Sequence, residues 1–500
     1  MKNRGYQNYV LGKWIAGDGV ETQLFHAISG ASIGACSSIG IPFKDVLDYG
    51  RDKGKALRKM TFQERGRMLK ALALYLIERK EFYYEVSAWT GATRVDSWID
   101  IEGGIGNLFA NASLRRQFPD LPYYVDGMAA PLSKNGTFIG HHIMVPKEGV
   151  AIHINAFNFP IWGMLEKIAV NLMAGVPAVV KPSEYTCYLT EVMVRDIIAS
   201  KILPEGSLQL VCGLGRGILD SVDSRDVVTF TGSAATGKIL KASPLITQES
   251  VPFNLEADSL NATILGPSAT PNTPEFELFI KECVKEITIK TGQKCTAVRR
   301  IIVPENHMDD VQRAISSKLS SIKIGDPSIE GVRMGALATK LQVERVRESA
   351  RKLAASQQIA YGSIDEVEVI GSHQGVGAFM SPILFSNDAP FKNTDVHDIE
   401  VFGPVSTIMP YKTLDEAIEL AKMGKGSLVS SIVTPNDAEA TEYVLGAANM
   451  HGRILVLNAN CAKESTGHGS PMPLLTHGGP GRAGGGEEMG GKRGVLHYLQ

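Results

Sequence analysis

The sequence predicts an α/β protein built on a doubly wound parallel sheet, and three observations support this prediction. Short apolar segments alternate with helical segments from residue 149 onwards, which is typical of parallel strands joined by crossover helices. The 500-residue chain is 44% hydrophobic and 21% charged, an ordinary globular composition. Its 51 glycines, about one residue in ten, indicate many tight turns.

Charge and hydropathy exclude several classes of protein. The 51 Lys and Arg residues against 53 Asp and Glu give a net charge of −2, which provides no overall field to hold nucleic acid or an anionic membrane. No apolar stretch near the N-terminus fits a signal peptide, and the longest apolar run, residues 168–180, is too short to span a bilayer. The six cysteines form no C-x-x-C pair. We therefore expect a cytoplasmic protein with no nucleic-acid or membrane partner, no disulfide framework and no metal.

The N-terminal part contains one clear helix and one extended segment. Residues 61–80 are an amphipathic helix whose start, Thr61 to Glu64, has the pattern of a capping box. Residues 123–144 have no helical period and indicate an extended excursion.

The central part predicts the parallel sheet. Strands are expected at residues 149–155, 176–180, 207–211 and 226–230, with helices at residues 165–174 and 190–200. After residue 255 a second alternation begins, with helices at 278–290 and 308–319 and a strand at 300–303. Two α/β domains follow from this, and a nucleotide usually binds at the carboxyl edge of such a sheet. The eight glycines of residues 478–491 suggest either a flexible linker or a segment that wraps over the fold.

A glycine-rich turn points to phosphate binding. Gly232 to Lys238 follows a strand and opens a helix, and it nearly matches a P-loop. Position 239 is Ile instead of the Mg²⁺-binding Ser or Thr, which argues against a kinase or ATPase. The turn can still receive a phosphate through backbone amides and the helix dipole. The segment from Gly213 to Gly217 lacks the dinucleotide pattern and is interpreted as a turn.

Four further residues are candidates, each with an ordinary structural explanation. A lone cysteine such as Cys295 is usually an inert core residue, but a preceding turn and the charge of Lys294 favour a reactive thiolate. Glu256 ends an expected strand at the domain junction and could be a surface carboxylate. Asn158 lies among apolar residues, so it either caps backbone or donates to a ligand. Glu400 opens a segment that could be a simple turn.

Taken in order, these segments resemble the motifs of the aldehyde dehydrogenase superfamily along nearly the whole chain. The motifs are Asn158-Phe-Pro, Lys181-Pro-Ser-Glu184, Phe230-Thr-Gly-Ser233, Glu256, Gly292-Gln-Lys-Cys295 and Glu400-Val-Phe-Gly-Pro404. Segments 153–160, 230–237, 256–261 and 478–488 are similar to one branch, the aldehyde dehydrogenase domains of bifunctional phenylacetate-degradation proteins. The next nearest resemblance is to 3,4-dehydroadipyl-CoA semialdehyde dehydrogenases.

The resemblance implies an organisation of the chain. It places a Rossmann-like NAD(P)-binding domain at residues 1–122 and 145–255 and an α/β catalytic domain at 256–457. Residues 123–144, a small oligomerisation hairpin, and 470–500 would bridge subunits of a homodimer or larger homo-oligomer. In the phenylacetate branch a ring-opening hydrolase with a hydratase-like fold is fused to this part, so we expect a fused or a separate hydrolase partner.

The resemblance also implies catalytic roles. Cys295 would be the nucleophile, and the Asn158 amide would form an oxyanion hole with the backbone N–H of Cys295. Glu256 would activate water to release the acid. Family members that pass the acyl group to CoA tend to lack this base, so a free carboxylate product is expected.

The implied cofactor is NAD or NADP. Lys181 would hold the adenosine ribose, Gly232 and Ser233 the pyrophosphate, and Glu400 the nicotinamide ribose. Glu184 matches an acidic residue that favours NAD by repelling a 2′-phosphate, whereas the phenylacetate branch leans to NADP. The sequence leaves the choice between NAD and NADP open.

The resulting hypothesis is NAD(P)-dependent oxidation of a CoA-linked semialdehyde of the 3-oxo-5,6-dehydrosuberyl-CoA type in phenylacetate or other aromatic catabolism. The alternatives within the class are 3,4-dehydroadipyl-CoA semialdehyde and a free aldehyde. Alternatives from other classes are a non-catalytic structural or binding protein on this fold and a nucleotide-hydrolysing enzyme.

Overall fold

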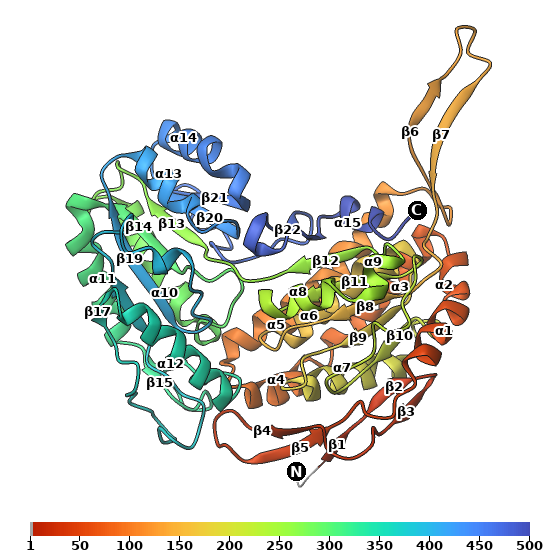
Figure 1. The fold of residues 1–500 in the computed structure, drawn as a ribbon, viewed down its shortest axis with the longest axis horizontal. Helices are drawn as coiled ribbons and strands as arrows, with labels where there is room; N and C mark the ends of the chain where they lie inside the picture. Colours follow the sequence, from red (N-terminus) through yellow and green to blue (C-terminus); the bar gives the residue numbers. More distant parts are fainter. Residues whose placement is uncertain (1–3) are drawn as a thin grey trace.

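Two seven-stranded sheets stand side by side in the computed structural model, which describes residues 4–500 (Figure 1). In the first sheet, five adjacent strands are parallel, and the last two strands are each paired antiparallel to the strand before them. The strand order is β12 (Phe253–Glu256), β11 (Val227–Thr231), β8 (Ala151–Ile154), β9 (Ala178–Lys181), β10 (Leu208–Leu210), β2 (Asn8–Val10) and β3 (Lys13–Ile15). The four strands expected from the sequence are confirmed.

The strand order creates a switch point between β8 and β11. From β8 the chain moves through β9 and β10 on one side, and then crosses to β11 and β12 on the other. The loops that leave the carboxyl ends of β8 and β11 therefore diverge and open a crevice, which is where α/β sheets bind ligands.

The chain passes directly from the first sheet into a separate second sheet. Six of its strands are parallel and one edge strand is antiparallel. Their order is β17 (Gln358–Tyr361), β18 (Ile383–Ser386), β19 (Val405–Tyr411), β14 (Arg300–Pro304), β13 (Ala262–Leu265), β20 (Ser427–Val433) and β21 (His451–Leu457). The chain passes from one sheet to the other between β12 and β13, so Glu256 lies at the junction.

Helices flank both sheets. Those associated with the first sheet are α1 (Phe43–Lys53), α2 (Lys55–Lys59), α3 (Phe62–Ile77), α4 (Lys80–Ser87), α5 (Arg94–Ser113), α6 (Pro160–Ala174), α7 (Cys187–Ser200), α8 (Ala234–Lys241) and α9 (Pro244–Gln248). Those associated with the second are α10 (Pro274–Thr288), α11 (Met308–Ser320), α12 (Lys340–Ala354), α13 (Leu414–Lys422) and α14 (Asp437–Ala447). The capping box of Thr61 and Glu64 is present at the start of α3.

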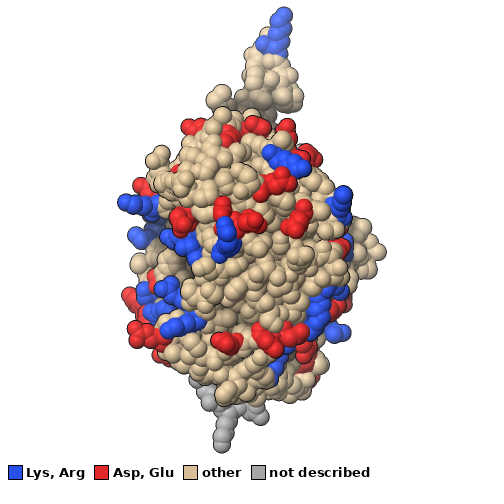
Figure 2. Space-filling view, turned by 90° about the vertical axis from the view of Figure 1, so that its left-hand side faces the viewer, with Lys and Arg blue, Asp and Glu red and all other residues tan. Residues whose placement is uncertain are grey.

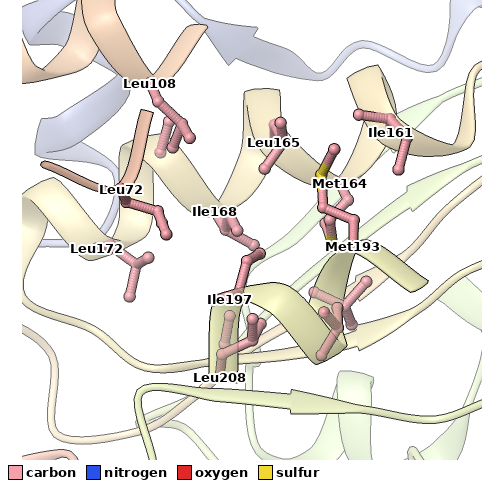
Figure 3. Packing of buried hydrophobic residues seen from close by; sticks show 14 of the residues in the cluster. Leu72, Leu108, Ile161, Met164, Leu165, Ile168, Leu172, Met193, Ile197 and Leu208 are labelled. Carbon is pink, nitrogen blue, oxygen red and sulfur yellow. The ribbon is translucent and has the colours of Figure 1, made fainter. Parts of the chain in front are cut away.

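Helix α6 is central to the largest core. Its Met164, Leu165 and Ile168 lie among Leu72 of α3, Leu108 of α5 and Ile197 of α7 (Figure 3). The helix begins at Pro160, five residues before the expected start, because Asp100 accepts hydrogen bonds from the backbone N–H groups of Ile161 and Trp162 at 3.0 and 2.7 Å. A carboxylate at a helix N-terminus satisfies free amides and complements the dipole.

The extended excursion forms the hairpin of β6 (Tyr124–Pro131) and β7 (Ile139–Met144), which projects away from the body of the molecule (Figures 1 and 2). The hairpin carries exposed apolar side chains, such as Met128 at 92% exposure and Phe138, just before β7, at 63%. Lys134 lies in the connecting turn.

The glycine-rich C-terminal segment wraps over the fold. It contains the paired strands β22 (Thr476–Gly478) and β23 (Glu487–Met489) and helix α15 (Lys492–Leu496). Strand β22 contacts β21 of the second sheet, and β23 contacts β12 of the first. The backbone N–H of Ala257 donates to the carbonyl of Ala483 at 3.0 Å. The flexible-linker interpretation is therefore wrong, because backbone pairing fixes this segment across both sheets.

The remaining strands form small sheets at the periphery: β1 (Arg4–Tyr6), β5 (Ser32–Cys36) and β4 (Thr22–Phe25) in one, and β15 (Lys323–Ile324) with β16 (Val332–Met334) in another. Within residues 4–500, no helix has the length and apolar character needed to cross a membrane. All six cysteines are free thiols.

One buried guanidinium ties several elements of the first domain together. Arg65 of α3 is fully buried and donates to five carbonyl oxygens, among them those of Leu57, Met173 and Ala174. Burial lowers the pKa of Arg65 to about 10. The side chain thus satisfies the free carbonyl groups at the ends of both α2 and α6.

Replacing Arg65 with Met is expected to lower the midpoint of thermal unfolding by roughly 5 °C or more, because each buried carbonyl left without a donor costs about 1–3 kcal/mol. Differential scanning calorimetry measures the effect. The matched control is Arg67→Met on the exposed face of the same helix. Equal midpoints for the two variants would contradict the role of Arg65.

Candidate active site

A cleft of about 930 Å³ opens at the switch point of the first sheet and extends to loops of the second. All eight candidate residues lie along it: Asn158, Lys181, Glu184, Gly232, Ser233, Glu256, Cys295 and Glu400. Residues far apart in the sequence, such as Asn158 and Glu400, are therefore brought to one surface.

The turn before Cys295 has an unusual backbone. Lys290 and Thr291 have φ values of 51° and 53°, and Gly292 follows at 66°. Non-glycine residues adopt this left-handed region only when tertiary contacts hold them there. A Cβ at Gly292 would lie 2.1 Å from the carbonyl oxygen of Gly403, so only glycine fits. The predicted turn is confirmed.

Contacts from several elements hold this turn. The Thr291 hydroxyl donates to the carbonyl of Gly335 at 3.1 Å, and the backbone N–H of Lys290 donates to Asp96 at 2.7 Å. The amide of Asn261 donates to the carbonyl of Cys295 at 2.8 Å. The thiol is thus placed at the inner end of the cleft by a rigid loop.

The surroundings of Cys295 combine the expected positive charge with burial and a carboxylate that oppose it. Burial and the neighbouring Glu256 carboxylate raise the pKa of the Cys295 thiol well above its ordinary value. Lys294 opposes this shift, but its ammonium lies 3.0 Å from the Glu286 carboxylate, which partners it. Lys294 therefore acts on the thiol in the expected direction, but burial and Glu256 outweigh it and an ion pair with Glu286 of α10 compensates its charge.

Glu256 and His477 face the thiol together. The Nε2 atom of His477 lies 3.3 Å from Oε1 of Glu256 and 3.9 Å from Sγ of Cys295. Burial alone would raise the pKa of Glu256, but His477 and Lys167 hold it below the usual range. Burial lowers and Glu256 raises the pKa of His477, with a net upward shift. The Glu256 carboxylate is thus kept ionised although it is buried.

A second buried cluster lies behind Glu256. The Lys167 ammonium lies 3.0 Å from Glu166 and 3.0 Å from Glu488, and oxygens of Glu166, Glu256 and Glu488 lie within 4.8 Å of one another. Burial and the neighbouring carboxylates raise the pKa of Glu488. Three carboxyl groups and one ammonium group are therefore buried together next to the thiol.

Asn158 lies in the loop after β8 and is buried. Its Nδ2 atom donates to the carbonyl of Gln293 at 3.0 Å, which places the amide beside the Cys295 loop. An asparagine amide has two N–H donors, so one is left for a ligand in the cleft.

The other end of the cleft has the features of a nucleotide site. Lys181 ends β9, and its ammonium lies 3.3 Å from the Glu184 carboxylate. Ser233 caps α8 by accepting from the backbone N–H of Thr236. The N–H of Gly232 donates to the carbonyl of Glu256 at 3.2 Å, which couples this turn to the thiol end. Ile239 is 73% exposed on the cleft and offers no hydroxyl for Mg²⁺, against a nucleotide-hydrolysing site.

Glu400 lies on the second-sheet side of the cleft. Its Oε2 accepts from the backbone N–H of Ser259 at 3.2 Å, and its Oε1 lies 3.7 Å from the Arg299 guanidinium. Burial raises the pKa of Glu400 to about 7. Oε1 has no hydrogen-bond partner among the described residues, which leaves it available to a ligand hydroxyl.

Sequence reasoning missed four residues of this site. His477 and Arg453 come from the C-terminal part, where no local pattern marked them. Glu488 ends the glycine-rich segment 478–488, but the sequence pattern gave it no role. Lys167 had a usable signal, because the charges of Glu166 and Lys167 within a mostly apolar helical segment must find buried partners.

The fold and the cleft define a class of protein: an α/β enzyme with a nucleotide-sized cleft and a thiol, a carboxylate and an amide at its inner end. The chain belongs to the aldehyde dehydrogenase family, whose model matches residues 43–500. It is an oxidoreductase that acts on aldehydes, and the alternative of a non-catalytic protein on this fold is set aside.

Relatives of known name support this assignment. The 3,4-dehydroadipyl-CoA semialdehyde dehydrogenase of Aromatoleum evansii is 41% identical over 475 residues, which are 95% of this chain and 92% of that protein. Protein MaoC of Klebsiella aerogenes is 48% identical over 168 residues, 33% of this chain and 48% of that protein.

Solved structures share the predicted fold. Betaine aldehyde dehydrogenase of Staphylococcus aureus in complex with NAD⁺ has a TM-score of 0.85 at 21% identity and covers 99% of this chain and 93% of its own. A 3,6-anhydro-L-galactose dehydrogenase in complex with NAP has a TM-score of 0.86 at 23% identity, covering 99% and 98%. The aldehyde dehydrogenase fold is confirmed.

Cys295 and Cys461, the two partly exposed thiols, are expected to react with iodoacetamide before the four buried cysteines. Because the thiolate is the nucleophile and the pKa of Cys295 is raised, its labelling rate should increase with pH through the alkaline range. Peptide mass spectrometry measures both rates, and Cys461→Ala isolates the Cys295 signal. Earlier labelling of Cys187 or Cys283 in the folded protein would contradict the described burial.

Proposed function

We propose that this enzyme oxidises a CoA-linked semialdehyde to the free carboxylate, with NAD or NADP as the hydride acceptor. The observation that carries the proposal is the joint placement of Cys295, Glu256 and Asn158 at the inner end of a nucleotide-sized cleft. A thiol, an ionised carboxylate and a free amide donor are the groups that oxidation through a covalent thioester needs.

Cys295 is the proposed nucleophile. Its sulfur attacks the aldehyde carbon, and the carbonyl oxygen takes the negative charge of the resulting thiohemiacetal. The second N–H of Asn158 and the backbone N–H of Cys295 would receive this oxygen. Loss of one such donor typically costs about 10²–10³ in rate. After hydride loss the acyl group remains as a thioester on Cys295.

Glu256 is the proposed base for the second half of the reaction. Its lowered pKa keeps the carboxylate ionised at neutral pH, as a base that takes a proton from water requires. Water then attacks the thioester carbon, and the thiol is released from the acid. We therefore expect a carboxylate product and no transfer to a second CoA.

The outer part of the cleft fits a dinucleotide. The turn at Gly232 and Ser233 can bind pyrophosphate through backbone N–H groups at the start of α8. Lys181 and Glu184 would hold the adenosine ribose, and the free Oε1 of Glu400 the nicotinamide ribose. When bound, the nicotinamide supplies the hydride acceptor.

The CoA-linked substrate rests on relatedness. The relative from Aromatoleum evansii is named for 3,4-dehydroadipyl-CoA semialdehyde, and the motif resemblance favours 3-oxo-5,6-dehydrosuberyl-CoA semialdehyde. Both are CoA-linked semialdehydes of aromatic catabolism, and we propose this class as the substrate.

We also propose a homodimer or larger homo-oligomer through the β6–β7 hairpin. A projecting two-stranded ribbon with exposed apolar side chains and free edges is marginal in water and favours pairing with another copy. A fused or separate hydrolase would supply the aldehyde.

The proposed substrate class predicts rapid reduction of NAD⁺ or NADP⁺ with a CoA-linked semialdehyde and little with hexanal. Absorbance of the reduced cofactor gives the rate, and Cys295→Ala is expected to abolish it. Mass spectrometry should find a free carboxylate on the product. Equal turnover of hexanal would favour a general aldehyde dehydrogenase, and full activity of Cys295→Ala would refute the nucleophile.

Glu184 predicts cofactor choice, because a carboxylate at the adenosine ribose repels a 2′-phosphate. Glu184→Thr is expected to raise the ratio of kcat/KM for NADP⁺ to that for NAD⁺ roughly tenfold. Glu277→Thr, an exposed carboxylate on α10, is the matched control for charge removal. An unchanged ratio in Glu184→Thr would show that another residue selects the cofactor.

A further inference from the structure

His477 contacts the proposed nucleophile but has no role in the function proposed above. It lies on β22, directly opposite Glu488 on β23, and its side chain is 3% exposed. The paired backbone of the two strands holds the ring in the interior, between Glu256 and Cys295. A buried histidine with three polar neighbours, two of which line the cleft, is a candidate for catalysis.

Arg453 fixes where the proton of His477 lies. The Nη1 atom of Arg453 lies 3.2 Å from Nδ1 of His477. A guanidinium can only donate, so a neutral ring that accepts at Nδ1 carries its proton on Nε2, and a protonated ring carries a proton there as well. Nε2 is the atom that faces both Glu256 and Cys295. His477 therefore directs an N–H donor at both the Glu256 carboxylate and the Cys295 sulfur.

The surroundings of the thiol explain why a donor is needed. Burial and an adjacent carboxylate both oppose formation of a thiolate at Cys295. The charged or titratable groups that face this cluster are Glu256, His477, Glu166, Lys167, Lys294, Arg299, Arg453 and Glu488. Lys294 and Lys167 are engaged by carboxylates, and among these groups His477 Nε2 makes the described hydrogen bond to the sulfur.

We propose that His477 is a further catalytic residue, whose Nε2–H hydrogen-bonds the Cys295 sulfur and stabilises the thiolate that attacks the aldehyde. This inference rests on the proposed role of Cys295. In the step, the S–H bond of Cys295 breaks and an O–H bond forms on Glu256, so the negative charge moves from the carboxylate to the sulfur. The proton of Nε2 stays on the ring. The same N–H faces the charge before and after the transfer, since Nε2 lies 3.3 Å from the oxygen and 3.9 Å from the sulfur.

The test compares two replacements of His477 by the pH dependence of Cys295 alkylation. His477→Leu removes the donor and is expected to slow alkylation at neutral pH roughly 10- to 100-fold and to shift its pH profile upward by about one to two units. kcat/KM for the aldehyde should fall by a similar factor. His477→Gln can place an amide N–H near the position of Nε2 and should restore most of the rate. All assays contain EDTA, because Glu256, Cys295 and His477 are close enough to share a metal ion.

A second background separates a direct effect on sulfur from an effect through Glu256. In Glu256→Gln the carboxylate charge is absent, and adding His477→Leu should still slow alkylation several-fold. If His477→Leu has no effect in that background, His477 acts only through Glu256 and the proposal is overturned. His497→Leu, a half-exposed histidine of the same C-terminal segment, is the matched control and should alkylate at the wild-type rate.

Two comparisons keep failure of this inference distinct from failure of the proposed function. Loss of turnover in Cys295→Ala together with wild-type alkylation in His477→Leu refutes the role of His477 alone. Retained turnover in Cys295→Ala refutes the proposed nucleophile, whatever His477 does. Near-ultraviolet circular dichroism and the unfolding midpoint establish that each variant is folded, and His477→Gln provides the rescue if His477→Leu is unstable.

Discussion

The left-handed turn at residues 290–292 is the constraint on which the site depends. Two non-glycine residues with positive φ cost free energy, and hydrogen bonds to Asp96 and Gly335 together with the close approach of Gly403 to Gly292 help to hold the turn in place. Asp96 comes from α5 and Gly403 from the loop before β19, so both sheets contribute. The position of the Cys295 sulfur is therefore a property of the assembled fold.

The same assembly sets the electrostatics of the cleft. Three buried carboxylates lie together next to a partly exposed thiol, an arrangement that would be strongly unfavourable without cations and donors nearby. Lys167 from α6 and His477 from β22 provide them. Because β22 and β23 belong to the C-terminal segment, that segment completes the charge balance of a site whose other parts precede it by many residues. The site is therefore complete only with the C-terminal segment in place.

The sequence predicts those parts of the fold whose causes are local. The capping box at Thr61 involves residues three apart, and the buried strands of the first sheet are short apolar runs between turn residues. The start of α6 could not be predicted, because its amides are satisfied by Asp100 from another helix. The partner of Lys294 could not be predicted for the same reason, since Glu286 becomes its neighbour only when α10 and the Cys295 loop pack together. The eight candidate residues converge on the cleft, yet ordered motifs identified them by family and left His477 unmarked.

Two demands on Glu256 oppose each other, and the structure shows how both can be met. A base that activates water must be ionised, but an ionised carboxylate next to a thiol disfavours the thiolate that starts the reaction. Moving the carboxylate away would help the thiol and remove the base. A donor within reach of both atoms avoids the conflict, because it stabilises negative charge on oxygen or on sulfur with little movement of the protein. His477 occupies this position, with its other nitrogen held by Arg453. Its Nε2–H is directional and lies close to both atoms, so the negative charge can move between oxygen and sulfur during turnover without a second donor.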